Sequence, residues 1–172
     1  MDVSESSMLW LALFILLLLS AFFSGSETGM MSLNRYRLRH QRKKSAGARR
    51  AAKLLATPDR LIGLILVGNN AVNILAAIIA NALAIIYVGE AAAPWVATAT
   101  LTILVLVFSE VTPKTIAAQY PEWFAFKASH IIKPLLTIFW PLVWAINKLT
   151  NGLVKLLGFD PNSSRDDGLD TE

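Results

Sequence analysis

The sequence has no cysteine and only two histidines, His40 and His130, among its 172 residues. The lack of cysteine excludes disulfides and thiolate metal sites. The two histidines do not form an H-x-x-x-H pair, so a zinc site is not expected. Charged residues make up only 16% of the chain, whereas hydrophobic residues make up 55%. The short chain, with few charged and many hydrophobic residues, predicts a small protein of one domain that is embedded in a membrane.

Three stretches of the chain are long and apolar enough to cross roughly 30 Å of hydrocarbon as helices. They cover about residues 8–31, 60–88 and 94–118. We expect Thr57 to cap the second helix, with Pro58 at its first position, and Pro94 to open the third. A cleaved signal peptide fits the first stretch poorly, because the residues before it are acidic rather than basic. The predicted fold class is an all-α membrane protein with three transmembrane helices.

Positive charge is concentrated in one place, since nine of the 16 basic residues lie between Arg35 and Lys53. Such a run is also found in nucleic-acid-binding proteins. Between two membrane spans, however, it is more simply a cytoplasmic anchor that lies along anionic headgroups. We therefore predict a multi-pass protein of the cell (plasma) membrane with no nucleic-acid partner. Its amino terminus would be outside and its carboxyl terminus cytoplasmic.

The pattern changes after residue 120. Residues 121–158 contain tryptophans interleaved with lysines and are interrupted by Pro134 and Pro141. This pattern predicts helices that lie in the inner interface as a juxtamembrane belt. A fourth, short spanning helix is the alternative reading. Residues 1–158 would form the transmembrane domain, and the polar, acidic residues 159–172 would be a linker.

Polar side chains interrupt all three apolar stretches. Such groups are costly in hydrocarbon, so by default they face a bundle interior or a water-filled cavity. Their hard oxygens suit Mg²⁺ or Na⁺ and disfavour soft transition metals. At 1.5 Å per residue, all three groups fall between the membrane midplane and the inner leaflet, where one ion could contact them together. The candidate ligands are Ser20, Ser24, Asn69, Asn70, Asn73, Ser109 and Glu110, with Gly25 and Pro113 as candidate helix breaks.

Each polar group also has a purely structural interpretation. A serine hydroxyl often bonds a carbonyl one turn back in a membrane helix, and residues 24–27 resemble a capping box. The asparagines could simply hydrogen-bond between helices. Pro113 has no N–H, so the carbonyl of Ser109 loses its helical partner beside Glu110, in a helix that we expect to be kinked. Alternatively, Lys114 pairs with Glu110 at i,i+4 and the cluster only seals the helix end.

Small residues suggest how the spans pack. Ala76, Ala80 and Ala84 repeat every four residues, which gives the second span one smooth face. This stripe predicts a dimer interface through the second and third helices. The alternative is that the stripe packs within a single chain.

Three ordered motifs resemble those of the CorC/CorB and cyclin M magnesium transporters. They are FFSGSET at residues 22–28, GNNAVN at 68–73 and SEVTPK at 109–114. The resemblance covers nearly the whole chain and matches the family's transmembrane domain. It implies a dimer of three-span domains with a juxtamembrane belt, followed beyond Glu172 by a pair of nucleotide-binding CBS domains. Carried over, the ion ligands would be Ser24, Asn69, Asn73 and Glu110, together with Ser20 and backbone carbonyls near Pro113.

The family resemblance implies Mg²⁺ export coupled to Na⁺. The candidate oxygens are enough to replace most of the water around Mg²⁺, so we expect a dehydrated Mg²⁺ site formed by the three helices. The substrate ion would be Mg²⁺, with Na⁺ as coupling ion, and the partners would be a second copy and the lipid bilayer. The alternative function is a membrane anchor and Mg²⁺ sensor that regulates other transporters. An enzyme is not expected, because no His or Asp lies within a span to activate Ser24.

Overall fold

The computed structural model describes residues 3–157, and every regular element in that range is a helix. The helices are α1 (Val3–Met31), α2 (Arg35–Gln41), α3 (Ala46–Leu55), α4 (Pro58–Val88), α5 (Ala93–Leu104), the π-helix η1 (Val105–Val111), α6 (Thr112–Gln119), α7 (Pro121–Ile138) and α8 (Trp140–Leu156). The all-α prediction is confirmed. The linker expected at residues 159–172 lies outside the described residues.

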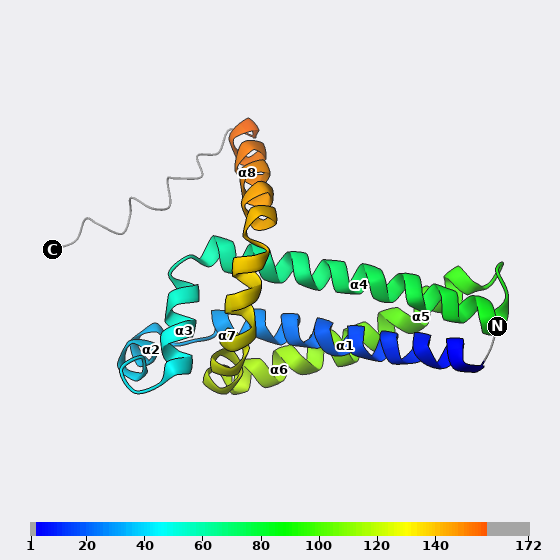
Figure 1. Ribbon diagram of the computed structural model, residues 1–172, viewed down its shortest axis with the longest axis horizontal. Helices are drawn as coiled ribbons and strands as arrows, with labels where there is room; N and C mark the ends of the chain where they lie inside the picture. The colour runs from blue at the N-terminus through cyan, green and yellow to red at the C-terminus, as the bar shows by residue number, and fades with distance from the viewer. Residues whose placement is uncertain (1–2, 158–172) are drawn as a thin grey trace.

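Three helical segments are long and apolar enough to cross a membrane: Ser6–Met31, Pro58–Val88 and Ala93–Gln119, the last being α5, η1 and α6 together. They run side by side along the long axis (Figure 1). Local signals set their ends as expected. Thr57 occupies the N-cap position of α4 with Pro58 in the first turn, but its side chain makes no capping hydrogen bond. Gly89 ends the helix with φ 78, in the left-handed region that favours glycine.

The basic residues gather at one end of the bundle, which we call the basic end. The short helices α2 and α3 lie there, and each begins at a capping side chain. Asn34 Oδ1 accepts a hydrogen bond from the Arg37 amide at 3.1 Å, and Ser45 Oγ accepts one from the Ala48 amide at 3.4 Å. The turn between α4 and α5 lies at the opposite end, which we call the far end (Figure 1).

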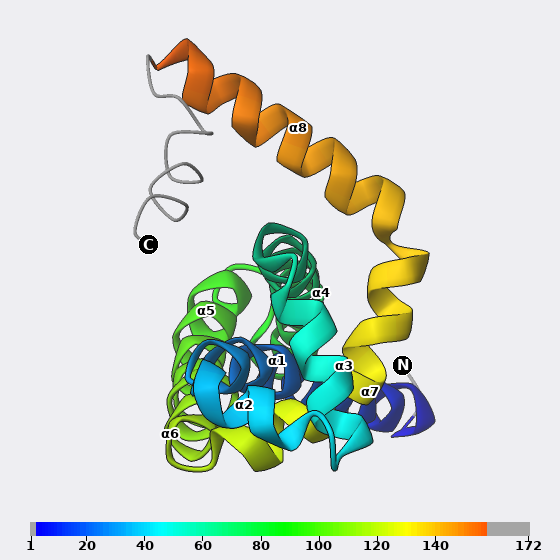
Figure 2. The same ribbon diagram turned by 90° about the vertical axis from the view of Figure 1, so that its left-hand side faces the viewer.

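Helices α7 and α8 lie across the bundle axis rather than along it (Figures 1 and 2). The break falls at Phe139, where the two helix axes bend by 79°. Pro134 stays inside α7, whereas Pro141 lies in the first turn of α8. The transverse course fits the predicted juxtamembrane belt. A count of four spans would require the bent pair to cross as one broken helix.

The largest hydrophobic core lies toward the basic end, where α1 and α4 meet α3, α7 and α8. Its fully buried members include Met30, Leu61, Ile65, Ile132 and Val143. This core fixes the belt against the ends of the spans, because burial of these side chains from water and lipid headgroups favours that packing. The polar residues singled out in the sequence lie beside this core, since its members Phe23 and Val72 are next to Ser24 and Asn73 in the chain.

The alanine stripe does not form the external face that the dimer prediction required. Ala76 packs with Leu13 and Leu101, and Ala84 packs with Ala93 and Ala97, all within one chain. Small side chains let α1 and α5 approach α4 closely, so the stripe is buried inside the protomer. The exposed side of α4 instead carries large residues such as Ile74 and Ile78.

Candidate ion-binding site

The polar groups of the three spans meet in one hydrogen-bonded cluster. Ser20 on α1 donates its hydroxyl toward two asparagines of α4, with Oγ 3.0 Å from Asn69 Oδ1 and 2.7 Å from Asn73 Oδ1. The asparagines are four residues apart and so share a helix face. Ser20 is fully buried, and its hydroxyl joins two amide oxygens of the neighbouring helix.

Glu110 from η1 extends the cluster to the third span. Asn69 Nδ2 donates to Glu110 Oε1 at 3.1 Å, and Ser24 Oγ donates to Glu110 Oε2 at 2.9 Å. Lys114 Nζ lies 2.9 Å from the same Oε2. Both carboxylate oxygens therefore have partners, and these come from all three spans. We call Ser20, Ser24, Asn69, Asn73 and Glu110 the polar cluster.

The serines of α1 separate into two groups. Ser26 donates to the Phe22 carbonyl one turn back in its own helix, which is the structural role expected of a membrane serine. Ser20 and Ser24 instead direct their hydroxyls across to α4 and η1. The capping-box interpretation of residues 24–27 is wrong, because α1 continues to Met31.

Two of the candidate ligands lie outside the polar cluster. Asn70 is exposed and lines a groove of about 800 Å³ between α4 and α8, together with Trp144 and Asn147. Ser109 is buried, and its hydroxyl donates to the Leu17 carbonyl of α1 at 3.0 Å. Ser109 thus holds η1 against α1 next to Glu110, whereas Asn70 belongs to a different face of α4.

The expected break at Gly25 is absent, since α1 is helical from Val3 to Met31. Gly25 serves close packing instead. A Cβ at this position would collide with the ring of Phe124 on α7. Gly68 beside Asn69 has the same role, because a Cβ there would lie 2.5 Å from Phe23 Cζ. Both glycines let an aromatic ring pack directly on helix backbone. Gly68 brings α4 against α1 beside the polar cluster, whereas Gly25 brings α7 against α1.

The irregularity expected near Pro113 is present as a π-helix. The segment η1 covers Val105–Val111, and the Thr112 amide bonds the Val107 carbonyl, five residues back. Pro113 follows at once in the first turn of α6 and supplies no N–H for the usual ladder. Such π-helical turns occur frequently at functional sites, because the widened turn changes where side chains point. Here it carries both Ser109 and Glu110.

A cavity of about 370 Å³ borders the polar cluster on the side of α4 and α5, and both Asn73 and Glu110 line it. Its wall also includes Thr98 and Thr102, two exposed hydroxyl residues that the sequence analysis did not select. Their spacing of four residues within a span was the signal that could have identified them. The cavity gives the polar cluster an open side.

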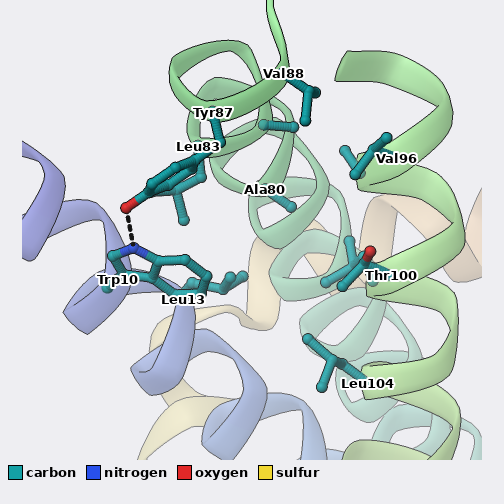
Figure 3. Close-up of a pocket in the computed structure, with 12 residues that line it drawn as sticks. Trp10, Leu13, Ala80, Leu83, Tyr87, Val88, Val96, Thr100 and Leu104 are labelled. Atoms are coloured by element: carbon teal, nitrogen blue, oxygen red, sulfur yellow. Dashed lines mark hydrogen bonds between the residues drawn. The ribbon is translucent and has the colours of Figure 1, made fainter. Parts of the chain in front are cut away.

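Toward the far end the three spans close over apolar side chains. A cavity of about 140 Å³ lies there, with Leu13, Ala80 and Leu104 in its wall, and Trp10 Nε1 donates to Tyr87 Oη at 3.2 Å beside it (Figure 3). Leu13 precedes Ser20 by seven residues, and Ala80 follows Asn73 by seven, so this cavity is about 10 Å along the helices from the polar cluster. Its apolar wall offers a cation no charged ligand.

Residues 3–157 contain no group of three or more His, Cys, Asp or Glu side chains that could hold a metal ion. The polar cluster differs from such sites because it combines one carboxylate with neutral hydroxyl and amide oxygens. These hard oxygen ligands are of the kind that hard cations prefer.

Comparison with known proteins gives one family. The model of the cyclin M transmembrane N-terminal domain matches residues 11–172. The chain is 52% identical over 141 residues to the UPF0053 inner membrane protein YfjD of Escherichia coli, covering 81% of this chain and 33% of that protein. It is 48% identical over 159 residues to a UPF0053 protein of Haemophilus influenzae, covering 92% of this chain and 38% of the relative.

A more distant relative carries a functional name. The polyamine export protein of Haemophilus influenzae is 28% identical over 175 residues, covering 94% of this chain and 40% of that protein. The chain thus spans between a third and two fifths of the length of these relatives. The family resemblance found from the three motifs is confirmed.

Proposed function

The chain belongs to the cyclin M transmembrane-domain family, and on that premise we propose that it transports Mg²⁺ across the membrane by way of the polar cluster. One observation carries the proposal. Oxygen-bearing side chains from all three spans, far apart in sequence, converge at membrane depth on one carboxylate. Polar residues that only formed hydrogen bonds between two packed helices would not need to come together from three helices.

The chemistry of the polar cluster suits a small hard cation. Its oxygens are Ser20 Oγ, Ser24 Oγ, Asn69 Oδ1, Asn73 Oδ1 and the two carboxylate oxygens of Glu110. Mg²⁺ takes an octahedral shell of oxygens at about 2.0–2.1 Å. If the hydroxyls and amides turn from one another toward an ion, they can replace most of its water. A largely dehydrated ion is therefore part of the proposal.

Direction and coupling rest on the family and on charge. With the basic end in the cytoplasm, as the positive-inside rule requires, the polar cluster lies nearer the cytoplasm and the apolar far end lies outside. Transport would then carry Mg²⁺ outward, coupled to Na⁺ entry, in the plasma membrane. A pair of nucleotide-binding CBS domains beyond residue 172 is part of the same proposal.

Two other functions compete with Mg²⁺ export. A membrane anchor that senses Mg²⁺ and regulates other transporters would also need an ion site. Polyamine export is the second, because a relative bears that name. A polyamine is a long chain of separated ammonium groups, whereas the polar cluster offers a single carboxylate that already has a lysine partner. The compact oxygen cluster therefore favours a single ion.

Flux into liposomes that contain only the purified protein separates the three functions. Mg²⁺ movement is followed with a fluorescent indicator in both gradient directions, with and without a Na⁺ gradient, and radiolabelled spermidine is tested in parallel. We expect Mg²⁺ flux that depends on Na⁺ and is abolished by Glu110→Gln. Spermidine flux without Mg²⁺ flux would assign polyamine export, and Mg²⁺ binding without any flux would assign the sensor.

A homodimer is also proposed, although not through the alanine stripe. Thr98 and Thr102 are exposed and line the cavity beside Asn73 and Glu110, and hydroxyls at membrane depth favour a protein neighbour over lipid. A second copy against α4 and α5 would cover them. Single cysteines at Thr98 and Thr102 should cross-link between chains in membranes, whereas a cysteine at Phe14, on the exposed side of α1, should not. Cross-links at Phe14 alone would place the interface elsewhere.

A further inference from the structure

Lys114 lies between two carboxylates from different helices. Its Nζ is 2.9 Å from Glu110 Oε2 and 3.9 Å from Glu27 Oε2. Glu110 belongs to the polar cluster, whereas Glu27 lies on α1, three residues beyond Ser24 toward the basic end. The Lys114 side chain is 43% exposed, and that of Glu27 is 31% exposed. The ammonium therefore lies partly in solvent and within 4 Å of both acids.

An ion-binding carboxylate at membrane depth needs a positive partner whenever no ion is bound to it. Removal of the ion leaves the Glu110 carboxylate without a counter-charge, and an unpaired charge in a poorly solvated place is costly. In this structure the Lys114 ammonium supplies that counter-charge directly.

A dication on Glu110 changes the balance of charges. The ammonium and the ion would then compete for the same carboxylate oxygen and repel each other at short range. The nearest other acid is Glu27, which already lies within 4 Å of the ammonium. A lysine side chain is a compact charge on a flexible four-carbon stem, so it can change partners without movement of the helix.

We propose that Lys114 is an exchangeable internal cation: it pairs with Glu110 when the site is empty and transfers to Glu27 when Mg²⁺ binds. The inference rests on the proposed function, since it concerns the same site. It assigns Glu27, which is not part of the polar cluster, the role of receiving the displaced ammonium. Because of this exchange, the negative charge of Glu110 has a positive partner throughout a transport cycle, including the moment at which the ion is released.

The proposal predicts that replacing Lys114 and replacing Glu27 have opposite effects on Mg²⁺ affinity. Lys114→Met removes the competitor, so Mg²⁺ should bind about fivefold more tightly, as expected for a partly exposed ion pair of close to 1 kcal/mol. The same variant should transport more slowly, because release now leaves Glu110 unpaired. Glu27→Gln removes the alternative partner and holds the ammonium on Glu110, so Mg²⁺ should bind about fivefold more weakly.

A double-mutant cycle tests whether Glu27 acts through Lys114. In the Lys114→Met background, Glu27→Gln should change Mg²⁺ affinity by no more than about twofold. Lys127→Met is the matched control, because Lys127 carries the same charge on α7 but contacts the Trp123 ring rather than an acid. It should bind Mg²⁺ like the parent, which separates local exchange from a general change of charge.

Mg²⁺ affinity is measured by titration calorimetry on the purified protein, with flux in liposomes as the second readout. Tighter binding by Lys114→Met together with weaker binding by Glu27→Gln supports the exchange. If the parent binds Mg²⁺ and Lys114→Met binds it equally or less tightly, the exchange is overturned while the transport site stands. If the parent binds no Mg²⁺, both proposals are overturned. Should Lys114→Met fail to fold, Glu27→Gln decides alone, since unchanged affinity refutes the exchange.

Discussion

Replacement of Glu110 by glutamine is the most direct test of the ion site. The carboxylate accepts hydrogen bonds from Ser24 at 2.9 Å and Asn69 at 3.1 Å, and it pairs with Lys114 at 2.9 Å. Glutamine has nearly the same shape and keeps one oxygen, but it removes the full negative charge of the polar cluster. The change therefore isolates the electrostatic contribution of Glu110 to binding a dication.

The expected loss can be bounded from the surroundings of Glu110. Removal of one partner of a buried charge pair costs about 2–5 kcal/mol. The Glu110 side chain is 23% exposed, so partial solvent screening places the effect near the lower limit. About 2 kcal/mol corresponds to Mg²⁺ binding that is roughly 30-fold weaker. Lys114 also loses the closer of its two carboxylate partners in this variant, and its positive charge, left with Glu27 alone, acts in the same direction.

Titration calorimetry with Mg²⁺ on the purified variants measures the effect. Ser26→Ala is the matched control within the bundle, because the Ser26 hydroxyl bonds only the Phe22 carbonyl of its own helix among the contacts described. Glu122→Gln is the charge-matched control, since Glu122 pairs with Arg37 at the basic end. Both should bind Mg²⁺ within about twofold of the parent. Parent-like affinity of Glu110→Gln would show that Glu110 is a structural partner of Lys114 and that the site lies elsewhere.

Three further predictions follow from the packing and the ligands. Gly68→Ala should lower the free energy of unfolding by about 1–3 kcal/mol, because its methyl would lie 2.5 Å from Phe23 Cζ. Gly152→Ala meets nothing within 4 Å and should be neutral or slightly stabilising. Denaturant unfolding compares the two variants, and an equal loss of stability in both would contradict the packing argument. Ser20→Ala should weaken Mg²⁺ binding about fivefold to tenfold in calorimetry, since it removes the hydroxyl that joins the two asparagine oxygens, and unchanged affinity would remove Ser20 from the site. A site with a single carboxylate should bind Mg²⁺ with a dissociation constant of roughly 10⁻⁵ to 10⁻³ M and leave few waters on the ion. A nanomolar constant would refute the expected affinity. Four or more waters on the ion in an experimental structure would refute the dehydrated site.

Hydropathy and local signals in the sequence were sufficient for the helices. Span lengths depend on runs of apolar residues, and helix starts depend on neighbours such as Thr57 and Pro58, so both are local properties of the chain. The irregularity near Pro113 was predictable for the same reason, since a missing N–H disturbs its own helix. That the disturbance is a π-helix over Val105–Val111 was not, because the choice of hydrogen-bond register depends on what the turn packs against.

Which polar residues face one another was decided by tertiary structure. Asn69 and Asn70 are adjacent in sequence but lie on different sides of α4, and only the rotation of that helix within the bundle places Asn69 on Glu110 and Asn70 in the groove beside α8. The same holds for Ser24 and Ser26 on α1. Periodicity gives relative directions along one helix, but it cannot fix the rotation of that helix against its neighbours.

Long-range packing also reversed two expectations from the sequence. Gly25 suggested a helix break, yet it provides space for Phe124, which is 99 residues away along the chain. The Ala76–Ala84 stripe suggested an external interface, yet α1 and α5 cover it within one chain. A small residue in a membrane helix shows that something approaches closely, and the sequence determines that much by itself. What approaches is set by the tertiary structure, because the neighbouring surface comes from another part of the chain.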